Sequence, residues 1–589
     1  MKTNKKIKKE VVLEGVGTSP GIAYGPAYVF NPYSINVSEL ETEIDDAEQE
    51  ILYFEKARRE VLKQLKYAQN NSEANYGDQF SDIFETQQAF LDDDVLLNEI
   101  RQALRDKKKS AVHVVTEVLS KKSEYFINLE NTYFRERAFD ILDLKQKLIL
   151  TLVGINIDYQ LSKPSIVLAE SLSPSDTVHF NRNFLLGFLT DKGGKTSHAA
   201  ILARGLQLPA VVNGNNLSKI IQNDDFIILD GFHGKIIINP SDQTIKKYKA
   251  KQKEYQSFKK TLLYEIEEKT ETLDGHYIQL MANIEFAHEL TDVRKNHAEG
   301  IGLFRTEHIF MDDNIDHDED SQFQIYKKLA LQSAPHEVVI RTIDIGGDKI
   351  VEGFGPGREP NPYLGWRAIR FCLDRPDIFR TQLRAIYRAS IYGKVGILIP
   401  LVSSISEISQ TINLINEVKE DLQSNNIEFN DNVPLGIMVE TPAAAISADI
   451  FAKYVDYFSI GTNDLTQYIL AIDRTNDRVS KYFNSFNPAV LSMVKLTIDA
   501  ARKNNISVTI CGEFGAVPEA IPLLLGMGLK SFSLTPHFIP ETKKIIRSIS
   551  LEKCEKLYKK VRKLHTEKAV ETTCRKFMQE NITDIKLLN

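Results

Sequence analysis

The second half of this 589-residue chain contains eight short apolar runs, most of them separated by stretches with helical periodicity. Eight buried strands that alternate with helices predict a (β/α)8 barrel, in which active sites form at the carboxyl ends of the strands. The runs are IQLMANI (278–284), GIGLFR (300–305), EVVIRTID (337–344), VGILIPLV (395–402), PLGIMVE (434–440), YFSIGT (457–462), SVTIC (507–511) and SFSLT (531–535). We therefore expect a TIM-like barrel in this half of the chain.

Two carboxylates lie at the ends of neighbouring runs. Glu440 ends the fifth run, and Asp464 follows the sixth with Asn463 beside it. Carboxylate and amide oxygens are the ligands that Mg²⁺ prefers. The sequence therefore predicts a magnesium site at the barrel rim, although Glu440 could instead cap a neighbouring helix.

Cations at the same predicted rim outnumber these two carboxylates. They are Arg305, Arg341, Lys349, Arg367 and Arg474. Guanidinium groups pair bidentately with phosphates and with carboxylates, so this excess indicates a polyanionic ligand, a phosphate that also bears a carboxylate. The alternative is that the arginines form structural salt bridges.

Cys511 ends the seventh run. An unperturbed thiol is mostly protonated at neutral pH, so Cys511 could donate a proton. A lone cysteine is also commonly a small buried apolar residue. The position at the rim favours the first interpretation.

The segment DKGGKTSHAAILARGLQLPAVV places His198 at the start of an expected helix. Gly193-Gly194 predicts a turn, Thr196 or Ser197 an N-cap, and 199–206 a helix. Free backbone N–H groups and the helix dipole favour an anion in the first turn, and the alanines that follow leave room for a partner. His198 is thus suited to carry a phosphoryl group, unless it is only an exposed residue of a capped helix.

In the first half of the chain, the sequence pattern changes twice, from strand-like to helical and back. Short strand-like runs give way at Ser38, which with Glu41 forms a capping box, to helical patterns that continue over 83–104, 111–119 and 135–150. Strand-like runs return from Ile166. We therefore expect a multidomain α/β protein with these parts: an α/β domain (1–37 and 154–241), an inserted all-α domain (38–153), a linker helix (242–269) and the barrel (270–589).

Composition excludes some classes of partner. The 73 basic and 80 acidic residues give a net charge of −7, which implies no general attraction to nucleic acid or to anionic membranes. The four cysteines lack metal-ligand spacing, and no signal peptide or membrane-length apolar run is visible. We expect a cytoplasmic protein.

Six blocks together carry a family resemblance. The chain resembles enzyme I of the bacterial sugar phosphotransferase system, the phosphoenolpyruvate–protein phosphotransferases, in the order that the family has them. The blocks are GGKTSHAAILARGLQLPAVV, GIGLFRTEHIFMDD, RTIDIGGDK, NPYLGWRAIR, GIMVETPAAA and YFSIGTNDLTQYILAIDRTN. The α/β domain would then be a swivelling phosphohistidine domain, and the inserted helices the docking domain for the carrier protein HPr.

The resemblance also implies a role for each candidate residue. His198 would be the phosphorylated nucleophile, with Thr177 close to it, and Cys511 would protonate the enolate as pyruvate forms. The residues that would bind phosphoenolpyruvate are Arg305, Arg341, Asn463, Asp464 and Arg474, with Lys349 and Arg367 contributing, and those that would hold Mg²⁺ are Glu440 and Asp464. A homodimer formed through the barrel is implied, as is a swing of His198 between the barrel and the helical domain about a hinge at 239–268.

Three positions depart from the family pattern. The stretch after Cys511 reads GEFGAV where the family often has GEMAGD, Lys195 replaces a common arginine, and Gln87 stands where many relatives place a histidine. Gln87 leaves the preferred carrier open. Two other functions also remain open: a nucleotide-using dikinase or synthase, and a regulatory paralogue that binds a carrier without turnover. We expect no nucleotide-binding domain and no sensory domain, which favours the first step of sugar uptake.

Overall fold

The computed structural model describes residues 9–30, 44, 46–76, 81–128, 132–155, 161–172, 176, 180–193, 199–200, 203, 206, 208–214, 216–311, 317–346, 361–474, 476 and 478–582. The chain divides into two compact units, Met1–Ser257 and Phe258–Lys586. Their boundary falls inside one long helix, α9 (Asp242–Glu265).

The first unit contains an eight-stranded mixed sheet in the order β1-β8-β7-β3-β4-β5-β6-β2. Strands β3 to β6 run parallel to their neighbours in that order, and the remaining pairs are antiparallel. The strands are β1 (Val11–Glu14), β2 (Val16–Ser19), β3 (Ile22–Phe30), β4 (Ser165–Ala169), β5 (Leu185–Thr190), β6 (Ala210–Val212), β7 (Phe226–Asp230) and β8 (Lys235–Ile238), with the short helices η3 (Arg182–Phe184) and α8 (Leu217–Ile220) between them. The β-rich texture predicted on either side of the helical block is confirmed.

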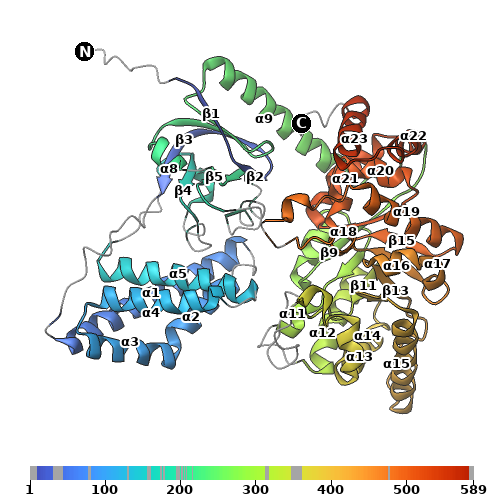
Figure 1. Cartoon of the computed structure of the whole chain (residues 1–589), viewed down its shortest axis with the longest axis horizontal. Coiled ribbons are helices and arrows are strands. Elements are labelled where there is room, and N and C mark those ends of the chain that lie inside the picture. The colour runs from blue at the N-terminus through green and yellow to red at the C-terminus, as the bar shows by residue number, and fades with distance from the viewer. Residues whose placement is uncertain are drawn as a thin grey trace. The chain divides into compact units, whose positions relative to one another are not determined.

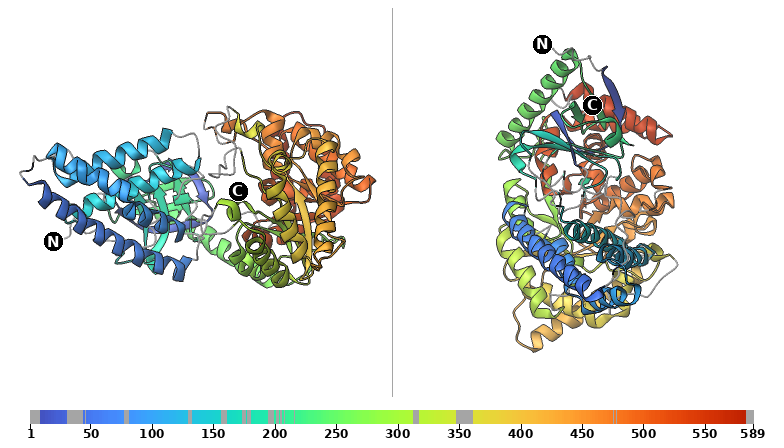
Figure 2. Two further views of the ribbon diagram at one scale, coloured as in Figure 1. Left: turned by 90° about the horizontal axis from the view of Figure 1, so that it is seen from below. Right: turned by 90° about the vertical axis from the view of Figure 1, so that its left-hand side faces the viewer.

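Five helices lie between β3 and β4 in the sequence and form a bundle (Figures 1 and 2). They are α1 (Ala47–Tyr76), α2 (Ser81–Asp92), α3 (Asp94–Lys107), α4 (Ala111–Asn128) and α5 (Thr132–Leu152). The helical pattern expected after Ser38 is present as α1, which buries Phe54 and Val61. The expected helix over 83–104 is instead two helices, because Asp93 accepts the Val95 N–H and starts α3. The Ser38 and Glu41 capping box lies outside the described residues.

The second unit is a closed barrel of eight parallel strands in sequential order from β9 to β16, which confirms the predicted (β/α)8 fold (Figure 1). Its strands are β9 (Gln279–Ile284), β10 (Ile301–Phe304), β11 (Glu337–Arg341), β12 (Lys394–Ile399), β13 (Leu435–Val439), β14 (Tyr457–Ile460), β15 (Ser507–Ile510) and β16 (Ser531–Leu534). Each predicted run contains or closely overlaps one of these strands.

Helices follow the barrel strands. They are η4 (Ala287–Glu289), α10 (Leu290–Lys295), α11 (Glu307–Met311), α12 (Glu319–Ser333), η5 (Pro362–Leu364), α13 (Ile369–Asp374), α14 (Pro376–Ala389), α15 (Ile405–Ser424), α16 (Pro442–Ile446), α17 (Ala448–Phe451), α18 (Thr462–Leu470), η6 (Ser480–Tyr482), α19 (Pro488–Lys503), η7 (Glu513–Ala516), α20 (Ala520–Gly526), η8 (Pro536–Phe538), α21 (Ile539–Arg547), α22 (Leu551–Val561) and α23 (Glu567–Asn581).

The register of the later barrel strands places the polar residues in layers. Met438 of β13 is paired with Ser459 of β14, which is paired with Thr509 of β15. Because side chains alternate along a strand, positions two residues further on point to the same face, one layer nearer the carboxyl ends. Glu440 and Cys511 occupy that upper layer, which forms the rim.

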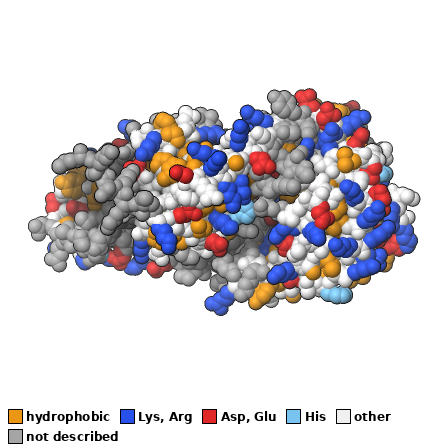
Figure 3. All heavy atoms as spheres, turned by 90° about the horizontal axis from the view of Figure 1, so that it is seen from above, with side chains coloured by type: hydrophobic (Ala, Val, Ile, Leu, Met, Phe, Trp, Pro, Cys, Tyr) orange, Lys and Arg blue, Asp and Glu red, His pale blue; other side chains and the backbone are white. Residues whose placement is uncertain are grey.

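Basic and acidic side chains are interspersed on the face of the molecule shown in Figure 3, as the small net charge leads one to expect. Among the described helices, none combines the length and the apolar character needed to cross a membrane.

Candidate functional site

The carboxyl ends of the barrel strands bring together most of the residues that the sequence singled out. Arg341 is the last residue of β11, Glu440 follows β13 and Cys511 follows β15. Asp464 lies in the first turn of α18, directly after β14, and Arg305 follows β10. Parallel strands that close into a barrel share one carboxyl edge, so these side chains lie around one rim.

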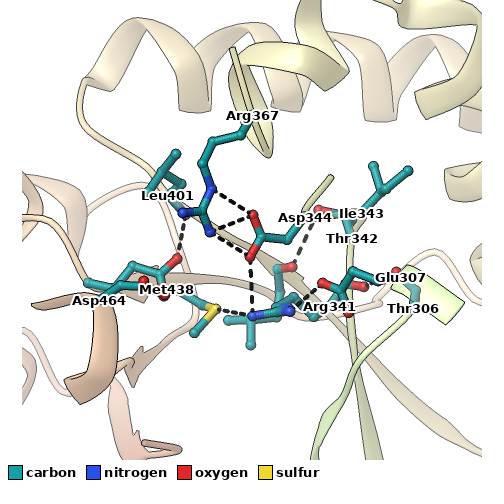
Figure 4. A network of polar contacts seen from close by, with 12 residues as sticks. Thr306, Glu307, Arg341, Thr342, Ile343, Asp344, Arg367, Leu401, Met438 and Asp464 are labelled. Carbon is teal, nitrogen blue, oxygen red and sulfur yellow. Dashed lines mark hydrogen bonds and ion pairs between the residues drawn. The ribbon is translucent and has the colours of Figure 1, made fainter. Parts of the chain in front are cut away.

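Arg341 is held by two carboxylates (Figure 4). Its Nη2 donates to Glu307 Oε1, and its Nη1 lies 3.6 Å from Asp344 Oδ2. Nη1 also donates to Met438 Sδ at 3.7 Å. Arg341 and Glu307 are 5% and 1% exposed, so this pair is removed from water and its fork is fixed in orientation.

Arg367 is held by the same Asp344. Its Nη2 lies 3.0 Å from both carboxylate oxygens, and its Nε donates to Oδ1 at 3.2 Å. Arg367 Nη1 also donates to Tyr468 Oη at 3.4 Å. Asp344 therefore lies between two of the predicted anion-binding arginines and fixes both (Figure 4).

These buried arginines remain charged. Burial alone would lower the pKa of Arg341. The carboxylates of Glu307, Asp344 and Glu440 raise it by more than burial lowers it, so the net shift of the pKa is upward. The pKa of Arg367 is likewise raised, because Asp344 outweighs the effect of burial. The rim thus holds fixed positive charge in a water-poor site, where it acts strongly on an anion.

Glu440 and Asp464 have carboxylate oxygens with no hydrogen-bond partner among the described residues. Glu440 Oε1 accepts the Leu401 N–H at 2.7 Å, but Oε2 has no such partner. Asp464 Oδ1 also lacks one and has only the Arg474 Nη2 at 3.7 Å. Both residues are buried. Burial, followed by the charges of Asp464 and Asp344, raises the pKa of Glu440.

Orphaned buried carboxylate oxygens are what a cation site requires before its ion arrives. The described residues contain no group of three or more His, Cys, Asp and Glu side chains placed to hold a metal. Mg²⁺ is commonly bound by one or two carboxylates, its other ligands being waters and substrate phosphate oxygens. Glu440 and Asp464 therefore fit Mg²⁺ bound together with a phosphorylated substrate.

Gly461 makes room for the Glu440 carboxylate. A Cβ at position 461 would lie 2.5 Å from Glu440 Oε2 and 3.0 Å from its Cβ. We expect Gly461→Ala to displace this carboxylate and to raise the Mg²⁺ concentration for half-maximal activity by about tenfold or more. A magnesium titration of activity measures this. Gly396→Ala, whose new Cβ meets nothing closer than 3.2 Å, is the control, and an equal response of the two variants would contradict the assignment.

Cys511 is held in a fixed backbone. Its carbonyl accepts from Asn283 Nδ2 at 2.9 Å, and Ser533 Oγ donates to Asn283 Oδ1 at 2.6 Å. Burial raises the pKa of the Cys511 thiol to about 11, so it keeps its proton at neutral pH. This suits a proton donor, and it also agrees with the alternative of a buried apolar residue.

Asn463 lies beside this loop. Its Oδ1 accepts the Glu513 N–H at 3.3 Å, which leaves the amide Nδ2 as the end that can donate to an anion. Arg474 is partly exposed at the same rim, and its backbone N–H donates to Gln467 Oε1 at 3.2 Å.

Three predicted residues, His198, Thr177 and Lys349, lie outside the described residues. Ala199, Ala200 and Ala203, which follow His198, are helical and buried. Ala199 and Ala203 belong to the core that packs on the sheet, so their small size serves close packing on that side.

Three contributors to the site went unrecognised in the sequence. Glu307 holds Arg341, Asn283 holds the Cys511 carbonyl, and the Leu401 N–H binds Glu440. Leu401 adopts a left-handed φ of 57°, an uncommon conformation for leucine that directs its N–H to the carboxylate. A backbone donor such as the Leu401 N–H leaves no signal in a sequence. Glu307 could have been recognised, because it follows the expected rim residue Arg305 by two positions.

Family models match most of the chain. They are described as PEP-utilising enzyme, N-terminal (residues 14–137), PEP-utilising enzyme, mobile domain (161–234), and PEP-utilising enzyme, PEP-binding domain (259–551).

Curated relatives extend over nearly the full length. Phosphoenolpyruvate-protein phosphotransferase of Priestia megaterium is 38% identical over 540 residues, which cover 91% of this chain and 94% of that protein. The protein of the same name from Buchnera aphidicola subsp. Schizaphis graminum is 39% identical over 570 residues, covering 96% and 100%. That of Bacillus subtilis is 38% identical over 560 residues, covering 95% and 98%. This chain belongs to the phosphoenolpyruvate-protein phosphotransferase family.

Proposed function

We propose that this chain transfers the phosphoryl group of phosphoenolpyruvate to its own His198 and then to a histidine of the carrier protein HPr, releasing pyruvate. Family membership makes it a phosphoenolpyruvate-dependent phosphotransferase of the sugar phosphotransferase system. The observation that carries the proposal is the rim where buried arginines meet orphaned carboxylate oxygens. A phosphate that bears a carboxylate matches the arginines, and a divalent cation bound with it would match the carboxylates.

In this proposal the substrate anion is bound by Arg305, Arg341, Asn463, Asp464 and Arg474, with Lys349 and Arg367 adding positive charge. The Arg341 fork, fixed by Glu307 and Asp344, orients the anion for in-line transfer. Glu440 and Asp464 would hold Mg²⁺, which when bound neutralises charge on the transferring phosphoryl group and on the enolate.

Cys511 completes the reaction by giving its proton to the methylene carbon of the enolate. The fixed backbone around Cys511 keeps the thiol at the rim, and the raised pKa of the thiol keeps it protonated. The charges of Arg341 and Arg305 lie near enough to favour the thiolate that remains.

We propose the domain boundaries that the sequence predicts: 1–37 and 154–241 for the phosphohistidine domain with Thr177 near His198, 38–153 for carrier docking, 242–269 for the linker and 270–589 for the barrel. His198 and the barrel rim belong to different compact units, whose boundary falls within α9. We propose that His198 swings between the barrel and the helical domain about a hinge at 239–268, as the division into two units inside α9 favours.

HPr would dock on the helical bundle. Gln87, which replaces a common histidine, is fully buried there, with its Nε2 2.8 Å from Asp143 Oδ2 and its Oε1 3.2 Å from Lys147 Nζ. Because its side chain is buried, any effect of Gln87 on the choice of carrier would act through the packing of α2 on α5.

A homodimer would form through exposed apolar residues of the barrel. Ile446 of α16, Ile450 of α17 and Leu496 of α19 are exposed, and α16 and α17 both pack on α19. We expect the double change Ile446→Lys and Ile450→Lys to lower the dimer fraction at micromolar concentration at least tenfold, as sedimentation measures. Val95→Lys, at an exposed position of α3, is the control. An unchanged dimer fraction in the double variant would place the interface elsewhere.

The test of the proposed function is turnover of phosphoenolpyruvate by the purified chain. Pyruvate should form in an amount equimolar with phosphorylated protein. Its formation should continue beyond one turnover only when HPr is present, and it should require Mg²⁺ but no nucleotide. A requirement for ATP or inorganic phosphate would instead indicate a dikinase. Carrier binding without any pyruvate would indicate a silent regulator.

A further inference from the structure

Ser459 is a polar residue inside the barrel to which the proposed mechanism gives no role. It lies in β14, in register with Met438 and Thr509, and is 0% exposed. The apolar cluster that fills this part of the barrel is formed by Leu303, Val339, Leu398, Met438, Tyr457 and Cys511. Ser459 therefore places a buried hydroxyl between Met438 and Thr509, in the layer directly below the rim.

The Ser459 hydroxyl has no hydrogen-bond partner of ordinary geometry in the described part of the chain. A buried hydroxyl without a partner is destabilising, and such groups are uncommon enough in native proteins to need an explanation. Alanine at this position would fit the strand and would avoid that cost. A state of the site in which the hydroxyl gains a hydrogen-bond partner would explain why a serine stands here.

Such a state arises when the neighbouring Cys511 thiol loses its proton. As a thiol, its Sγ lies 3.6 Å from the Ile460 carbonyl oxygen and can donate to it. The same carbonyl already accepts the Cys511 N–H at 3.1 Å. When the proton leaves, the thiolate faces this oxygen with no proton between them, and it needs a new donor.

Register places Ser459 beside the thiol. Ser459 is paired with Thr509, and Cys511 lies two residues further along β15, on the same face of the barrel wall. The hydroxyl is close enough to influence the sulfur: burial raises the pKa of the Cys511 thiol, and Ser459 opposes that rise.

We propose that Ser459 is a positioning residue whose hydroxyl donates a hydrogen bond to the Cys511 thiolate at the moment of proton transfer. The S–H bond breaks and its electron pair stays on sulfur, while the enolate C=C pair takes the proton to form the methyl group of pyruvate. The thiolate later regains a proton from water. This inference rests on the proposed function, in which Cys511 protonates the enolate.

The test separates the two steps of a single turnover with Ser459→Ala. Phosphorylation of the protein from labelled phosphoenolpyruvate should keep its wild-type rate, while pyruvate, followed with lactate dehydrogenase, should appear about tenfold more slowly. The slowing in D₂O should grow, because proton transfer becomes limiting. The variant should melt at or above the wild-type temperature, since it loses an unpaired buried hydroxyl.

Two further variants complete the design. In a Cys511→Ala background, Ser459→Ala should cause no additional slowing, because its partner is gone. Ser390→Ala is the control: this buried barrel hydroxyl donates to the Tyr387 carbonyl and accepts the Asn430 N–H, so it should lose stability and keep both rates.

The outcomes are distinguishable. Equal slowing of phosphorylation and pyruvate release in Ser459→Ala, or additive slowing in the double variant, would overturn the role of Ser459 and leave Cys511 as donor. Unchanged pyruvate formation in Cys511→Ala would overturn the proposed proton donor, and this inference with it.

Discussion

Glu440→Gln is expected to lower the rate of pyruvate formation by about 10²–10³-fold. Glutamine keeps the shape of the side chain and can still accept the Leu401 N–H through Oε1. It removes the buried charge whose second oxygen has no hydrogen-bond partner among the described residues. Because we propose that this oxygen binds Mg²⁺, the concentration of Mg²⁺ for half-maximal activity should also rise at least tenfold.

Magnesium binding is also expected to depend on pH, and the raised pKa of Glu440 sets the direction of that dependence. Burial and the charges of Asp464 and Asp344 raise the pKa of Glu440, so a proton competes with the metal. Apparent Mg²⁺ affinity of the wild type should therefore increase with pH until it passes the raised pKa, and this dependence should be weaker in Glu440→Gln.

Glu407→Gln is the matched control for Glu440. Glu407 accepts the N–H groups of Ser403 and Ser404 through Oε2 and the Ser403 hydroxyl through Oε1, so neither of its oxygens is orphaned. It should lose some stability and keep the wild-type response to Mg²⁺. A magnesium response of Glu440→Gln equal to that of Glu407→Gln would refute the metal assignment.

Arg341→Lys is expected to reduce kcat/KM for phosphoenolpyruvate by about 10²–10³-fold although the charge is conserved. Lysine is a point charge and cannot reproduce the fork that Glu307 and Asp344 hold in place. It would also leave part of the buried charge of Glu307 uncompensated. Steady-state kinetics with varied phosphoenolpyruvate measure the effect.

An arginine outside the rim provides the control for replacing a guanidinium group by an ammonium group. Arg388 of α14 pairs with Glu319 and Asp320 on α12, outside the rim, so Arg388→Lys should change kcat/KM less than twofold. Comparable losses in Arg341→Lys and Arg388→Lys would mean that Arg341 supports the fold and does not bind substrate.

The sequence predicted the barrel well because its signal is local. Each strand is a buried apolar run, and closure then brings the residues at the run ends together, which explains why Arg341, Glu440, Asp464 and Cys511 lie around one rim. The break at Asp93 was missed because an N-cap inside a continuous periodic pattern resembles an ordinary polar surface residue.

What could not be predicted depends on tertiary contacts or on the backbone. Glu307 acquires its role only when β10 and β11 lie side by side, and the Leu401 N–H acquires one through a left-handed turn. Arg367 was predicted to contribute charge to the pocket, but its tight pairing with Asp344 is invisible in a sequence where the two are 23 residues apart.

The central claim is tested most directly by following label from ³²P-phosphoenolpyruvate onto the purified protein with Mg²⁺ and without nucleotide, in the wild type and in His198→Ala. The account predicts acid-labile, alkali-stable label on the wild type that passes to added HPr, and none on His198→Ala. Equal labelling of both proteins, or label that requires ATP, would contradict it.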